Sequence, residues 1–399
     1  MFQLVWLAAF VFVVILELWF RFLNHSNDKS NRSKTSKGLN ASSYLFESCS
    51  KMEAHPTYAN HGIANQTFFD EMQASVGKIS FLPLEARNVI GDYINIDGGE
   101  RLTKNSSANN IENDSVISSN ENWIALGGST VLCLEVPDAF TWPSYLQATI
   151  DSSSKNGVRI HNFGQPGLKS AKINQLFPLF LNRYTEVTQI VVYFGVNDAG
   201  WIAGSRPTSR LVYVIDFVFD GLSAVSKLFA FLTLRMRAQR VSRASADYAN
   251  RTIKKFFDYH EYFNSKGIKI YFILQPNVFC KTRPSRLEID LIESAEPLRI
   301  TGLHAAYETY LSNGGGLIKP AVSTFSDTDE TIFIDWCHVG VKGNSLIARR
   351  IWGILNDVPN SQVEINTAMS VMKSHKDTAL KARHIFQNKD EMVYNYPLF

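Results

Sequence analysis

Residues 123–130 read Trp-Ile-Ala-Leu-Gly-Gly-Ser-Thr, and this stretch decides the fold. The apolar start is typical of a buried strand, and Gly127 and Gly128 then permit a tight turn before Ser129. A serine on a sharp strand-to-helix turn has an exposed hydroxyl and an N–H that points where an oxyanion forms. A simple turn with a capping serine would give the same residues, and a P-loop is disfavoured because no Gly-Lys-Ser/Thr follows.

Apolar runs alternate with helical patterns along the rest of this region. Strands are predicted at residues 123, 158, 189 and 270, and helices over 142–150, 170–182, 244–266 and 344–355. Such alternation is typical of a parallel sheet with helices packed against it. The sequence therefore predicts an α/β fold, a three-layer sandwich around a central parallel sheet.

Two further motifs follow predicted strands. Residues 162–167 read Asn-Phe-Gly-Gln-Pro-Gly, and Gly167 could offer an unobstructed backbone N–H to a substrate. Residues 195–198 read Gly-Val-Asn-Asp, which places Asn197 at the carboxyl end of a strand, where open α/β sheets bind ligands. Each motif also has a plain interpretation as a turn. If they act together, the glycine N–H and the asparagine amide are two donors for an oxyanion.

A fourth motif supplies an acid and a base. Asp335 and His338 lie three residues apart, directly after the apolar residues 331–334. A carboxylate beside an imidazole fixes its tautomer and stabilises the imidazolium, and histidine suits a general base near neutral pH. A surface Asp/His pair before a helix is the alternative. The order of the four motifs, each after a strand signal, favours ester chemistry over four unrelated turns.

With these blocks in this order, the chain resembles the SGNH hydrolases, the superfamily that includes the GDSL esterases and lipases. The resemblance spans roughly residues 123–355 and implies the flavodoxin-like fold of that family. It implies Ser129 as nucleophile, His338 as base and Asp335 as its orienting acid. It also implies an oxyanion hole formed by Ser129, Gly167 and Asn197. One departure is that the usual Gly-Asp-Ser-Leu is here Gly-Gly-Ser-Thr.

The expected function is a membrane-tethered serine hydrolase that removes acyl groups from an ester without a metal or an organic cofactor. By the family resemblance, the substrate is an O-acyl group on a glycan, and a lipid ester is the other candidate. An O-acyltransferase on the same fold uses the same residues, and sequence does not separate it from a hydrolase. A non-catalytic membrane scaffold is a third possibility, which the retained Ser129, Asn197, Asp335 and His338 oppose.

Composition agrees with a globular enzyme. The chain has 399 residues, 45% of them hydrophobic, and a net charge of +3, so nothing indicates a nucleic-acid partner. Its four cysteines match no zinc-binding spacing: Cys49, Cys133, Cys280 and Cys337. Cys133 and Cys337, near Ser129 and His338 in sequence, are interpreted as small core residues.

The N-terminus carries a candidate membrane span. Residues 4–23 are nearly all apolar, interrupted by Glu17 and Arg21, and about twenty such residues cross a hydrocarbon core. A cleaved signal peptide is the alternative, but no basic segment precedes the run and no small-residue cleavage site is evident. We therefore expect residues 1–23 to be a single-pass anchor and the polar residues 24–45 to be a flexible tether.

Two considerations predict opposite orientations of this anchor in the membrane. Basic residues follow the span, so the positive-inside rule predicts a cytoplasmic enzyme. Membrane-anchored relatives more often face outward, and we expect an extracytoplasmic catalytic domain on that ground.

The remaining segments complete the expected organisation. Residues 46–119 form an N-terminal extension with a β-hairpin over 93–103 and a mobile loop over 104–122. The hydrolase domain covers 120–358, and 359–399 is a tail without an assigned role. An insertion over 204–243 contains an apolar helix, 211–234, followed by an arginine cluster. This helix could lie in a membrane interface, be buried in the domain or cover the cleft.

Overall fold

The structure is a computed structural model that describes residues 48–59, 61–81, 87–104, 121–153, 157–198, 227–358 and 361–382. The chain divides into two compact units. The first comprises Met1–Ala41, Arg206–Thr233 and Asn388–Phe399, and the described residues in it are 227–233, the start of a helix. The second, Ser42–Ser205 and Leu234–Gln387, contains the sheet and the candidate site.

A seven-stranded sheet forms the centre of the second unit. Its order is β1(Ile96–Asp97), β2(Glu100–Arg101), β4(Val158–Gly164), β3(Glu121–Gly127), β5(Val187–Phe194), β6(Lys269–Leu274) and β7(Ile318–Pro320). The five strands from β4 to β7 are parallel. Taken in chain order, these five strands have the 2-1-3-4-5 arrangement of flavodoxin-like sheets, as predicted.

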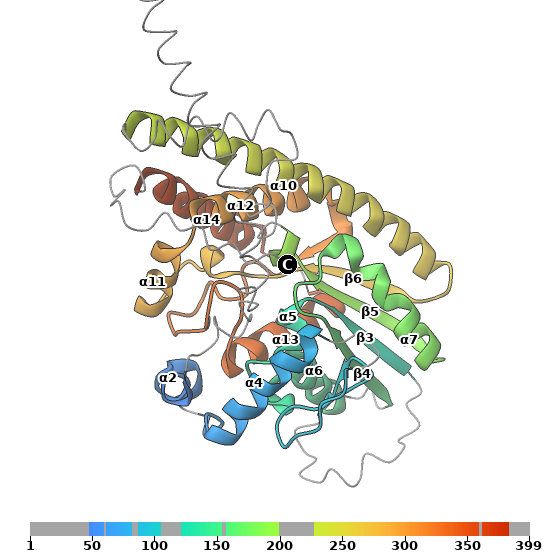
Figure 1. Cartoon of the computed structure of the whole chain (residues 1–399). Helices are drawn as coiled ribbons and strands as arrows, with labels where there is room; N and C mark the ends of the chain where they lie inside the picture. The colour runs from blue at the N-terminus through green and yellow to red at the C-terminus, as the bar shows by residue number, and fades with distance from the viewer. Residues whose placement is uncertain are drawn as a thin grey trace, which may run out of the picture. The chain divides into compact units, whose positions relative to one another are not determined.

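Helices cover both faces of this sheet. The α-helices of the described residues are α2(Cys49–Ala54), α3(Pro56–Ala59), α4(Gln66–Phe81), α5(Ser129–Leu132), α6(Trp142–Asp151), α7(Phe177–Arg183), α10(Lys227–Asn264), α11(Arg286–Ser294), α12(Pro297–Asn313), α13(Val341–Leu355) and α14(Gln362–Ala382). Figure 1 shows α6 and α13 on one side of the sheet and α10 and α12 on the other. This is the three-layer arrangement that the alternating pattern predicts.

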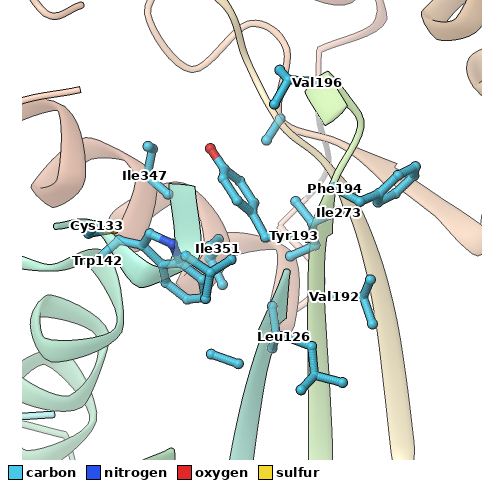
Figure 2. Packing of buried hydrophobic residues seen from close by; sticks show 14 of the residues in the cluster. Leu126, Cys133, Trp142, Val192, Tyr193, Phe194, Val196, Ile273, Ile347 and Ile351 are labelled. Atoms are coloured by element: carbon cyan, nitrogen blue, oxygen red, sulfur yellow. The ribbon is translucent and has the colours of Figure 1, made fainter. Parts of the chain in front are cut away.

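The core on the two faces comes from alternate residues of the central strands. In Figure 2, Tyr193 points toward Trp142 of α6, while Phe194 points to the opposite side of the sheet. The rings of Trp142 and Tyr193 are 5.6 Å apart, and Phe194 meets Phe256 of α10 at 4.9 Å. All four side chains are buried, at 4% exposure or less. Burial on both faces explains why the strand at 187–194 reads as a continuous apolar run.

The predicted hairpin is present, and it changes the nature of the sheet. β1 and β2 are antiparallel, with Ile96 opposite Arg101, and the turn between them contains Gly98 and Gly99. β2 then pairs antiparallel with β4 through Arg101 and Asn162. The central strands are parallel as predicted, but the sheet as a whole is mixed, because the hairpin adds two antiparallel strands at one edge instead of only packing on the domain.

Several predicted elements have different limits. The helix predicted over 170–182 is a 3₁₀ helix, η6(Ser170–Leu176), followed by α7, which has Pro178 in its first turn. Proline lacks the N–H that would continue the preceding helix, so a new helix starts there. The helix predicted from 244 is longer and begins at Lys227. The helix predicted over 344–355 begins at Val341, and 362–382 form α14.

Some predictions concern residues that the structure does not describe. The anchor and the tether, the loop over 105–120 and the insertion up to 226 all lie outside the described residues. Among the helices that the structure describes, none combines the length and the apolar character that a membrane span requires.

Candidate active site

Three of the predicted residues follow neighbouring strands at the same edge of the sheet. Ser129 comes after β3, Gly167 after β4 and Asn197 after β5. β4 lies on one side of β3 and β5 on the other, so the strand order reverses at β3. This switch point is where open α/β sheets bind ligands, because the loops after the two flanking strands diverge there.

Ser129 is the first residue of the short helix α5. The backbone N–H groups of Val131 and Leu132 donate to the Gly128 carbonyl at 3.1 and 3.2 Å, which forms the tight turn after β3. The helix ends at Cys133, a buried residue in the left-handed conformation with φ 54°. The turn thus presents Ser129 at a helix N-terminus, as the sequence predicts.

His338 and Asp335 lie beside this serine, although about two hundred residues separate them in the chain. The Nε2 atom of His338 is 2.8 Å from Ser129 Oγ, and its Nδ1 atom is 2.7 Å from Asp335 Oδ2. The other carboxylate oxygen, Oδ1, accepts the backbone N–H groups of Cys337 and His338 at 2.8 and 2.7 Å. The structure therefore joins carboxylate, imidazole and hydroxyl in one hydrogen-bonded chain.

The segment that carries Asp335 and His338 is a tight hairpin and not a strand of the sheet. Ile334 N–H donates to the His338 carbonyl at 2.9 Å, and Phe333 forms an isolated bridge with Val339. The strand signal at 331–334 therefore does not correspond to a strand of the sheet. The N–H groups of Ile332 and Phe333 bind a side chain instead of a neighbouring strand.

That side chain is Glu288 in α11, which sequence reasoning did not select. Its Oε1 atom accepts the N–H groups of Ile332 and Phe333 at 2.9 and 3.1 Å, and its Oε2 atom accepts Lys281 Nζ at 2.6 Å. The side chains of Lys281 and Glu288 are fully buried. This buried ion pair holds the base of the hairpin. The sequence signal was the capping box of Ser285 and Glu288.

Burial and charge act in opposite directions on the acid and the base. Burial raises the pKa of the Asp335 carboxyl, but the charge of His338 and the hydrogen bonds from His338 and Cys337 outweigh it, so this pKa is lowered overall. Burial lowers the pKa of His338, but the charge of Asp335 and their hydrogen bond raise this pKa well above its ordinary value. The pair therefore favours the ionised carboxylate and the imidazolium.

Gly167 and Asn197 lie in the loops that follow β4 and β5. Gly167 has φ +67°, a conformation that glycine adopts without strain, and no described atom lies within 4 Å of where a Cβ would stand. Asn197 Nδ2 donates to the Leu168 carbonyl at 3.1 Å. One amide hydrogen of Asn197 is thus held by the Gly167 loop, and among the described residues the second has no acceptor.

Gly128 lies against the side-chain amide of Asn197. A Cβ at Gly128 would stand 2.2 Å from Asn197 Nδ2, far inside ordinary contact. The Asn197 amide therefore lies directly against the residue before the serine. An aspartate at position 128 does not fit unless Asn197 moves.

Cys337 gives this site a possible metal-binding set. Asp335, Cys337 and His338 each place one potential ligand atom within 4.8 Å of the others. However, burial raises the pKa of the Cys337 thiol to about 11, so the thiol is protonated near neutral pH. The hydrogen bond between Asp335 and His338 would also have to open to admit an ion. Cys133 and Cys337 are buried and free, as expected of core residues.

A small cavity adjoins the site, and a larger one lies elsewhere. A cavity of about 10 Å³ is lined by Gly128, Asn197 and Gln275, among others, and has room for about one water molecule. A cavity of about 210 Å³ is lined by Lys269 and Lys319 at the amino-terminal ends of β6 and β7. That edge is opposite to Ser129, so we do not assign the larger cavity to the reaction.

No protein-family model and no curated protein matches this sequence. The structure is similar to that of a carbohydrate acetylesterase family member from Sinorhizobium meliloti, at 13% identity and a TM-score of 0.37, over 60% of this chain and 98% of that one. It is also similar to an acetylxylan esterase from Geobacillus stearothermophilus, at 14% identity and a TM-score of 0.32, over 61% of this chain and 96% of that one.

A third similar structure is a member of the lipolytic protein G-D-S-L family from Veillonella parvula, at 14% identity and a TM-score of 0.31, over 59% of this chain and 99% of that one. The function proposed below depends on the geometry of this chain's own side chains.

Proposed function

We propose that this chain is an ester hydrolase of the SGNH type, in which Ser129 is the nucleophile. The observation that carries the proposal is the hydrogen-bonded chain from Asp335 through His338 to Ser129, with contacts of 2.7 and 2.8 Å. These contacts have the length and the order that general-base activation of a serine requires.

The proposed reaction has two steps. Neutral His338 takes the hydroxyl proton while Ser129 Oγ attacks the acyl carbonyl carbon, and the same proton then goes to the leaving alcohol. Water, activated by His338, next releases the acyl group from Ser129. The N–H groups of Ser129 and Gly167 and the Nδ2 amide of Asn197 are the proposed donors to the oxyanion in both steps.

We propose esters of small acyl groups as substrates, and O-acetylated glycans are the first class to test because the family resemblance predicts them. An anchor over residues 4–23 that places the domain outside the cytoplasm is part of the same proposal. The apolar length of that segment supports the anchor, and the outward orientation rests on the resemblance to membrane-anchored relatives.

A panel of esters tests this function. The detergent-solubilised full chain is incubated with nitrophenyl esters from acetyl to decanoyl and with an O-acetylated glycan, and acyl release is measured. The Ser129→Ala variant should lose roughly 10⁶-fold in kcat, the scale known for such triads.

The matched control is Ser265→Ala at the exposed end of α10, where the hydroxyl donates to the Tyr262 carbonyl. This variant should keep full activity. Turnover by Ser129→Ala at a rate near that of the wild type would remove Ser129 from the role of nucleophile. Absence of release from every ester, together with no labelling of Ser129 by a fluorophosphonate, would overturn the enzyme function.

A further inference from the structure

Asp198 follows Asn197 directly, and the reaction proposed above does not use its carboxylate. The residue is buried, at 1% exposure. Its oxygens accept the Ser170 N–H at 2.8 Å, the Ser170 hydroxyl at 2.6 Å and the Tyr310 hydroxyl at 2.8 Å. Ser170 begins η6, immediately after the loop that contains Gly167. The carboxylate thus ties the block after β5 to the loop after β4.

We infer that Asp198 is a positioning residue, which holds the Gly167 loop and the Asn197 amide at the separation that an oxyanion requires. The inference rests on the proposed function, because it assigns Gly167 and Asn197 as donors. It extends that function by assigning two roles to residues 195–198. Asn197 donates to the oxyanion, and Asp198 positions the Gly167 donor on the neighbouring loop.

The Gly167 loop depends on these contacts because Gly167 has little packing of its own. It is exposed, and no described atom lies within 4 Å of the position that a Cβ would take. The loop is held where Leu168 O accepts Asn197 Nδ2 at 3.1 Å and where Ser170 binds Asp198. Two consecutive residues of one block therefore hold the loop just after the glycine. A shift of Ser170 would reach Gly167 through only three peptide units.

Burial makes this contact stronger than a surface hydrogen bond. Solvent does not compete for the carboxylate, and Asp198 has donors on both sides, Ser170 in the loop and Tyr310 in α12. Tyr310 could mean that Asp198 only stabilises the packing of α12. The two roles differ in which partner matters. Ser170 lies in the segment after Gly167, and the Tyr248 hydroxyl accepts the Ala171 N–H of that segment at 3.4 Å, whereas Tyr310 lies in α12. Tyr310→Phe, which removes one hydrogen bond to the same carboxylate, is therefore the matched control.

The test compares three variants of the full chain with an acetyl ester, at a temperature where each remains folded by circular dichroism. Asp198→Ala removes every contact of the carboxylate. Asp198→Asn keeps one oxygen that can accept the Ser170 N–H. The kcat and KM values are measured separately, and the low-field proton resonance of His338 Nδ1–H reports whether the Asp335–His338 pair is intact.

We expect Asp198→Ala to lower kcat by about 10²-fold, the scale of one lost oxyanion donor, with KM changed by less than about threefold. Asp198→Asn should recover part of this loss, Tyr310→Phe should retain kcat, and the His338 resonance should be unchanged in all three.

If Asp198→Ala does not fold, the kcat of Asp198→Asn is compared with that of Tyr310→Phe. Equal kcat values in these two variants would overturn the inference. A folded Asp198→Ala with kcat near that of the wild type would also overturn it, as would an equal loss in Tyr310→Phe. Inactivity of the wild type toward every ester would instead overturn the proposed function, and the positioning role with it.

Discussion

Replacing Gly128 by alanine should disable the oxyanion hole without unfolding the protein. The new Cβ would stand 2.2 Å from Asn197 Nδ2, so the amide must move by roughly 1 Å to reach the 3.4 Å of ordinary contact. The atom that must move is the end of a side chain, and Gly128 has φ −83° and ψ −157°, which alanine also adopts. The fold should therefore survive while the donor leaves its place.

The magnitude follows from the displacement. A misplacement of about 1 Å can cost 10²-fold in rate, and loss of one oxyanion donor costs about 10²–10³-fold in kcat. We expect Gly128→Ala to lower kcat for an acetyl ester by about 10²-fold, with KM nearly unchanged because the donor acts on the transition state. Initial rates over a range of substrate concentrations separate the two parameters.

A double-mutant cycle tests whether Gly128→Ala acts through the Asn197 amide. Asn197→Ala should lower kcat by about 10²–10³-fold, and adding Gly128→Ala to it should cost little more, because the clashing atom is gone. Gly353→Ala in α13 is the control, since its nearest neighbour would be 3.6 Å away, and it should leave kcat unchanged. A double variant whose loss in kcat equals the product of the two single losses, or a folded Gly128→Ala with normal kcat, would show that Gly128 does not act through the Asn197 amide.

The further predictions concern pH, the buried ion pair and the N-terminus. Activity should rise with pH through an apparent pKa above about 6.5, because His338 must be neutral to act as a base. Asp335→Asn should shift this rise in the pH–rate profile to lower pH and reduce kcat by up to about 10⁴-fold. The raised pKa of His338 should contribute to the free energy of unfolding fully below about pH 6.5, the pKa in the unfolded chain. This contribution should be lost as the pH rises through the pKa of His338 in the folded protein, as urea titrations at several pH values would measure. Lys281→Met, which leaves Glu288 buried and unpaired, should reduce the free energy of unfolding by about 3–5 kcal/mol, and an unchanged urea midpoint would contradict this. Deletion of residues 1–43 should release a folded, active domain from membranes, and a truncated protein that still sediments with them would place a second membrane contact elsewhere in the chain.

Local sequence patterns predicted most of the elements correctly, and the errors have identifiable causes. The strands at 123, 158, 189 and 270 are present because long apolar runs are buried on both faces. The prediction of one continuous helix over 170–182 was wrong because Pro178 has no N–H to continue the first helix, so a second helix begins there. The strand signal at 331–334 does not correspond to a strand of the sheet, because the N–H groups of Ile332 and Phe333 bind Glu288, a partner about forty residues away.

The sequence by itself determined the alternating α/β pattern and the four short blocks, because each block is a turn whose conformation depends on adjacent residues. It also determined which residues could act as nucleophile, base, acid and donor, since chemistry belongs to residue types. Only the tertiary structure decided that His338 Nε2 lies 2.8 Å from Ser129 Oγ, and that Asp198 binds the loop of Gly167. Those contacts depend on the order of strands in the sheet and on burial, which come from packing of the whole second unit and from no single segment.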